Sequence, residues 1–92
     1  MTHYVIRLIT GANGQRTEFD GYYVKEYKTP RMRADGTYAA DGKLIVTRDR
    51  ATAKRYPTAA QAWEVWRAQR GWRPDGKPNR PLTAWHAEIE RV

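Results

Sequence analysis

The chain has 92 residues, a formal net charge of +7 from 17 Lys and Arg against 10 Asp and Glu, and no cysteine. This length fits one small domain, residues 1–92, and the lack of cysteine excludes disulfides, thiol nucleophiles and cysteine-based zinc sites. Because the sequence contains neither an apolar run of about 18–20 residues nor a signal-peptide core, we expect a protein that does not span a membrane and works in the cytoplasm.

The first half of the chain predicts three β-strands. Residues 4–9 (YVIRLI) are mostly β-branched or aromatic, and Asn13-Gly14 has the chemistry of a hairpin turn. The chain then returns over residues 17–27, where Gly21 is expected to mark a break or a bulge. The strongly apolar run 44–47 (LIVT) predicts a short central strand.

One helix is expected in the second half. Asp49 can cap a short turn, and Thr58 with Gln61 forms a capping box in front of an apolar stripe. Gly71 is the expected end of the helix. The stripe consists of Ala59, Ala62, Trp63 and Trp66, which recur at helical spacing.

Residues 82–92 alternate apolar and polar side chains, which is typical of a half-buried strand. The order β-β-β-α-β predicts an α+β fold: a single antiparallel sheet of about four strands with one helix packed on one face. The pattern leaves open whether the last strand pairs with the first or the third. The side chains expected to cover the apolar stripe of the helix are Ile6, Leu8, Val24, Ile45 and Ile89.

The positive charge is concentrated in the middle of the chain. The segment from Lys25 to Arg80 holds 14 positive and 6 negative residues, whereas the two ends together hold 3 positive and 4 negative ones. Much of it falls in two stretches rich in Pro and Gly, 28–43 and 72–81, which we expect to be irregular basic loops. Most of the cations are Arg, which pairs with phosphate bidentately, so the composition favours an anionic partner. The alternative is a charged surface that only aids solubility.

Catalytic motifs are missing from the sequence. There is no Ser or Cys for a nucleophilic triad, and no phosphate-binding glycine loop. His86 and Glu88 would share one strand face, with His3 nearby if the end strands pair, but a polar outer face of a sheet is the simpler interpretation. We therefore expect no enzyme activity, no metal and no cofactor; a small metal-free ribonuclease is an alternative.

Basic residues interleaved with aromatic ones are typical of nucleic-acid binding, because cations neutralise phosphates and exposed rings stack on unpaired bases. The same residue types also suit a protein interface. We expect a non-catalytic protein that contacts nucleic acid or a nucleoprotein complex. The residues expected to make this contact are Lys25, Lys28, Arg31, Arg33, Arg48, Arg50, Lys54, Arg55, Arg70, Trp72, Arg73, Lys77 and Arg80.

Three segments are distinctive: GYYVKEY (21–27), LIVTRDRATAKRYPTAAQAWEVW (44–66) and RPDGKPNRPLTAWHAEIE (73–90). Together they resemble small uncharacterised proteins encoded by bacteriophages and prophages. The resemblance implies a compact α+β build and carries no activity. Phage proteins of this size and build include inhibitors of host defence. A more specific alternative is therefore an anti-CRISPR-type inhibitor that docks on a CRISPR–Cas effector in the host cytoplasm.

Overall fold

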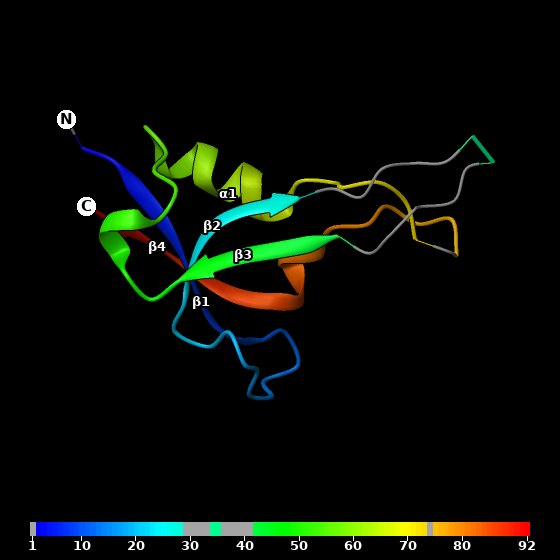
Figure 1. Cartoon of the computed structure of the whole chain (residues 1–92), viewed down its shortest axis with the longest axis horizontal. Coiled ribbons are helices and arrows are strands. Elements are labelled where there is room, and N and C mark those ends of the chain that lie inside the picture. Colours follow the sequence, from blue (N-terminus) through cyan, green and yellow to red (C-terminus); the bar gives the residue numbers. More distant parts are fainter. Residues whose placement is uncertain (1, 29–33, 36–41, 74) are drawn as a thin grey trace.

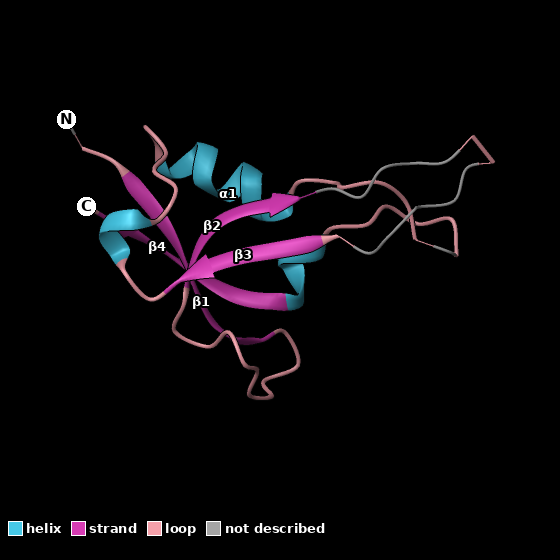
Figure 2. Ribbon diagram, in the orientation of Figure 1, coloured by secondary structure: helices cyan, strands magenta, loops and turns pink. Residues whose placement is uncertain are grey.

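The structure, a computed structural model, describes residues 2–28, 34–35, 42–73 and 75–92. In these ranges it has one four-stranded antiparallel sheet and one α-helix (Figures 1 and 2). The strands are β1 (Tyr4–Gly11), β2 (Tyr23–Lys28), β3 (Lys43–Thr47) and β4 (Trp85–Arg91). The helices are α1 (Ala59–Arg67) and the short 3-10 helices η1 (Arg50–Thr52) and η2 (Pro81–Ala84). The α+β fold predicted from the sequence is confirmed. No helix in the described part of the chain has the length and apolar character needed to cross a membrane.

The strand order is β3-β2-β1-β4. The last strand pairs with the first, antiparallel, from Tyr4 opposite Arg91 to Gly11 opposite Trp85. The prediction that residues 44–47 form a central strand is wrong, because β3 pairs only with β2 and lies at the edge of the sheet. Its side chains are half-buried on both faces. An apolar run indicates that both faces of a strand are covered, but it does not indicate how many strands pair with that strand.

The return strand begins later than the expected residue 17. Thr17 and Asp20 are joined by a side-chain hydrogen bond of 2.7 Å, and the Tyr22 amide donates to the Phe19 carbonyl at 3.0 Å. These bonds form a turn ahead of β2. Gly21 ends this turn with φ of +83°, a conformation that glycine adopts without strain, so the predicted break at this position is confirmed.

The sheet consists of two ribbons, β3-β2 and β1-β4, that meet at a single residue pair, Arg7 opposite Tyr23. Beyond this pair β1 and β2 separate, and residues 54–56 occupy the space between them. The Lys54 amide donates to the Val24 carbonyl at 3.2 Å, and Tyr56 exchanges two backbone hydrogen bonds with Tyr4, of 2.8 and 2.9 Å. In Figure 1 the four strands run at different angles to one another.

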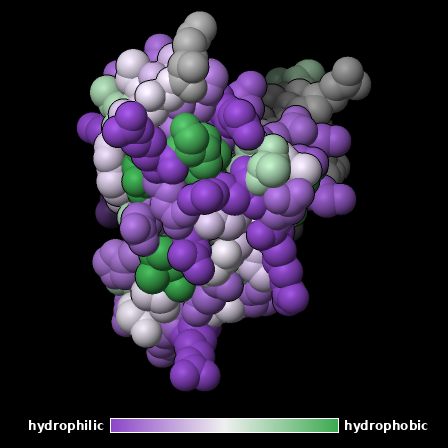
Figure 3. Space-filling model, turned by 90° about the vertical axis from the view of Figure 1, so that its left-hand side faces the viewer, coloured by the Kyte–Doolittle hydropathy of each residue, from purple (hydrophilic) through white to green (hydrophobic). Residues whose placement is uncertain are grey.

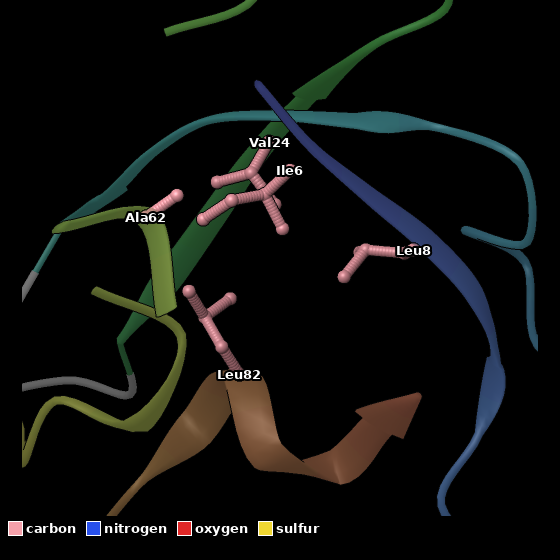
Figure 4. Packing of buried hydrophobic residues seen from close by; sticks show 5 residues of the cluster. All are labelled: Ile6, Leu8, Val24, Ala62 and Leu82. Carbon is pink, nitrogen blue, oxygen red and sulfur yellow. The ribbon is translucent and has the colours of Figure 1, made fainter. Parts of the chain in front are cut away.

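The core lies between the two ribbons and α1. Its five buried members come from four elements and are at most 3% exposed (Figure 4). They are Ile6, Leu8, Val24, Ala62 and Leu82. Leu82, predicted to begin the last strand, enters the core from η2.

Three residues expected in the core, Ala59, Trp63 and Ile45, are neither in this cluster nor among the partly buried residues packed against it. The helix packs against it with Ala62, Val65 and Trp66, whereas Trp63 contacts the edge of the Trp66 ring at a centroid distance of 5.6 Å. Ile45 is also outside, because its neighbours Leu44 and Val46 take the inner face of β3 and side chains alternate along a strand.

The helix begins as predicted and ends early. The Thr58 hydroxyl accepts a hydrogen bond from the Gln61 amide at 3.1 Å, which confirms the cap. The helix ends at Arg67, before the predicted Gly71, because Ala68 is already extended, with ψ of 135°. The following residues pair with a distant segment: the Arg70 amide donates to the Asn79 carbonyl at 2.6 Å. The arm expected to be irregular therefore starts with a short hairpin.

Candidate nucleic-acid interface

A cavity of about 470 Å³ opens beside the core, where β2, residues 54–56, the end of α1 and η2 meet. Its apolar wall is the outer surface of the core, formed by Val24, Val65 and Leu82. Residues 54–56 lie between β1 and β2, to which they are hydrogen-bonded. From this segment Lys54 and Tyr56 line the cavity.

Three cationic residues line this cavity: Lys25, Lys54 and Arg70. They are far apart in the sequence, and the structure brings them to one cavity. Lys25 lies on β2, and the backbone of Lys54 is held beside β2 by the hydrogen bond from its amide to the Val24 carbonyl. Arg70 is half-buried, and Asn79 holds its backbone on both sides, accepting from its amide and donating from Nδ2 to its carbonyl at 3.2 Å. An anion in the cavity would meet all three charges.

Two tyrosines, Tyr27 and Tyr56, also line the cavity, and both are half-buried. The Tyr27 ring lies so close to Gly42 that a Cβ atom at position 42 would overlap it. Burial raises the pKa of the Tyr56 hydroxyl above its usual 10.0, and the nearby Arg70 charge acts in the opposite direction. Tyr56 is therefore protonated at neutral pH and can donate a hydrogen bond.

Glu26 is the acidic member among the described residues that line the cavity. It is exposed, and it leaves the lining with a net positive charge. An ionised carboxylate only accepts hydrogen bonds, so the cavity combines anion-binding and amine-binding groups within a few residues of each other.

Arg50, predicted to contact a partner, is committed to an ion pair in the structure. Its Nη1 lies 3.5 Å from Glu90 Oε1, while Arg7 lies 3.4 Å from Glu90 Oε2 and the Tyr23 hydroxyl donates to Oε1 at 3.0 Å. The group lies on the sheet face away from α1, since the neighbouring Ile89 packs into the core. Sequence reasoning missed it because the partners come from opposite ends of the chain.

Other predicted contact residues hold loops in place. Arg48 Nε donates to the Tyr22 hydroxyl at 2.7 Å, Arg73 forms a 3.3 Å ion pair with Asp75, and Arg80 Nη1 donates to the Arg67 carbonyl at 2.5 Å. Each is still exposed and adds to the surface potential.

The remaining predicted contact residues fall into two sets. Arg31 and Arg33 lie outside the described residues. The exposed ones are Lys28 at the end of β2, Arg55, Lys77 and Trp72, which is 54% exposed.

The expected proximity of His3 to His86 is wrong. The two end strands do pair, but His3 exchanges backbone hydrogen bonds with Val92 while His86 lies opposite Thr10. The two side chains are thus at opposite ends of the β1–β4 ribbon. Among the described residues, no group of three or more His, Cys, Asp or Glu is placed to hold a metal ion.

The face of the molecule in Figure 3 is mostly hydrophilic, with hydrophobic residues in small separate patches. Of the large hydrophobic side chains that the structure describes, Ile9 and Trp72 are the exposed ones, at 39% and 54%. Scattered patches of this kind are normal on a soluble surface. The charged and aromatic cavity is therefore the more distinctive feature.

Neither a protein-family model, nor a curated protein, nor a solved structure matches this chain. The resemblance to small phage proteins and the anti-CRISPR alternative stay predictions.

Proposed function

We propose that the chain is a non-catalytic protein that binds nucleic acid, alone or within a nucleoprotein complex, through a basic surface centred on the cavity. The observation that supports this most is the convergence of Lys25, Lys54 and Arg70 beside two tyrosine rings. Cations with aromatic side chains are the combination that proteins use to hold a phosphate backbone and its unpaired bases.

The wider surface adds to this attraction. Lys28, Arg55 and Lys77 are exposed, and the formal net charge of +7 gives the whole protein a positive potential. The paired arginines Arg50 and Arg73 contribute less, because each already faces a carboxylate. We expect nucleic-acid affinity to depend more on the cations around the cavity than on the arginines that are paired with Glu90.

The test is the salt dependence of binding to labelled oligonucleotides. Contact with about four to six phosphates predicts a log–log slope of about −3 to −4 on single strands and about −4 to −5 on duplex DNA. Fluorescence anisotropy between about 50 and 200 mM salt measures this slope. Absence of binding to either form at about 50 mM salt would contradict the proposal.

A further inference from the structure

The cavity is suited to a small ligand as well as to a charged surface. Its volume of about 470 Å³ lies in the range of about 300–1,000 Å³ that is usual for small-molecule sites. Its wall is continuous with the buried core, and its rim carries the charges. A ligand with an apolar part and an anionic part would complement this lining.

We propose that this cavity holds one unstacked nucleotide of a single-stranded nucleic acid, its base against the tyrosines and its phosphate near the cations. This inference rests on the proposed function and narrows it to single strands. Inside a duplex both faces of each base are covered by stacking, so a paired base cannot enter the site without leaving its helix.

The base is accommodated by the apolar wall and the rings. Tyr27 and Tyr56 contribute aromatic side chains to the lining, and Val65 contributes an apolar one from α1. Every base has a π-face, so stacking on tyrosine stabilises binding with little regard to sequence. The lining alone therefore predicts a weak sequence preference.

The phosphate is accommodated by the cations. Lys25 and Lys54 line the cavity and are exposed, whereas Arg70 is half-buried near Tyr56. A guanidinium in such a position is pre-organised for a phosphate. Glu26 suits a sugar hydroxyl or a base amino group and not the phosphate, because a carboxylate accepts and does not donate.

The experiment uses a single-stranded oligothymidylate of about 12 nucleotides with one fluorescent 2-aminopurine near its centre. Anisotropy gives the affinity, and quenching of the 2-aminopurine reports stacking on an aromatic ring. For the wild-type protein we expect quenching on binding, and weaker binding of a duplex of the same length at the same salt concentration.

The first variants remove charge in two matched pairs. Lys25→Gln with Lys54→Gln changes the cavity, and Arg16→Gln with Arg91→Gln removes the same charge from exposed positions outside it. Because the site holds one phosphate, the cavity pair should reduce the salt slope by about 0.7. The control pair should leave the slope as in the wild type.

The second variants test the ring. Tyr27→Leu keeps the apolar bulk but removes the aromatic face, so affinity should fall at least about fivefold and the quenching should decrease. Tyr27→Phe should behave as the wild type. Circular dichroism checks the fold of each variant. If Tyr27→Leu does not fold, the double variant of the exposed Lys25 and Lys54 still tests the nucleotide site.

The failures are distinguishable. If the wild-type protein binds no oligonucleotide, the proposed function is wrong. If it binds and the cavity pair matches the control pair, or Tyr27→Leu matches Tyr27→Phe, the nucleotide site is wrong while the function stands. Equal or tighter binding of the duplex would also overturn the site.

Discussion

Glu90 organises the face of the sheet away from α1. Its carboxylate accepts hydrogen bonds from Arg7 and the Tyr23 hydroxyl and forms an ion pair with Arg50, and its side chain is 16% exposed. The Arg7 and Arg50 side chains are 41% and 53% exposed, so solvent screens both ion pairs and each contributes little to stability. One acidic residue thus takes a predicted contact residue, Arg50, out of the set of freely available cations.

The tyrosine hydroxyls predict how stability depends on alkaline pH. Burial, followed by the hydrogen bond to Glu90, raises the pKa of Tyr23, and burial raises that of Tyr56, both above the usual 10.0. Above pH 10 the unfolded chain therefore loses these protons first. Stability should be complete below pH 10 and fall as the pH rises through the window above it.

Urea unfolding at several pH values from neutral to alkaline measures this dependence. In the double variant Tyr23→Phe with Tyr56→Phe, the difference between neutral and alkaline pH should be smaller than in the wild type. An unchanged difference would show that other groups cause the loss.

The packing of α1 predicts an asymmetry between two tryptophans of the same helix. Trp66 packs against the core, and its Nε1 donates to the Trp85 carbonyl at 3.1 Å, so Trp66→Ala should lower the free energy of unfolding by roughly 3–5 kcal/mol. Trp63 lies outside the buried cluster, and Trp63→Ala should cost less. Chemical denaturation of both variants measures the difference, and equal losses would contradict this packing.

Among the helices, strands and turns, the sequence predicted correctly those features that depend on neighbouring residues. The Thr58 cap, the alternation in β4 and the break at Gly21 all follow from a few adjacent residues. Long-range partners decided the rest. The backbone hydrogen bond from Arg70 to Asn79 follows the early end of the helix. The hydrogen bonds of residues 54–56 to both β1 and β2 place this segment at the cavity.

The candidate site shows the same division. Composition identified the basic groups that contain Lys25, Lys54 and Arg70, since charge is visible in any sequence. Their convergence was not predictable, because it depends on two strands that separate after one pair. Val65 and Leu82 were missed as lining residues for the same reason.

For the whole molecule, the excess of positive charge predicts opposite responses to salt. Repulsion among like charges destabilises the compact state, and salt screens it over about 10 Å at 0.1 M. With a net charge of +7, the midpoint of thermal unfolding should rise as salt increases from about 20 to 200 mM, while nucleic-acid affinity falls. Thermal unfolding by circular dichroism tests this, and a falling midpoint would show that ion pairs such as Arg50–Glu90 outweigh the repulsion.

The pairing of β1 with β4 also has a consequence for biosynthesis. β1 leaves the ribosome first, and its main partner is the strand that is translated last among the described elements. β2 can pair early with β3 and with β1, its neighbours in sequence, whereas the pairing of β1 with β4 joins distant segments and forms slowly. A nascent chain stalled before Trp85 would therefore leave one backbone edge of β1 unpaired until β4 is made.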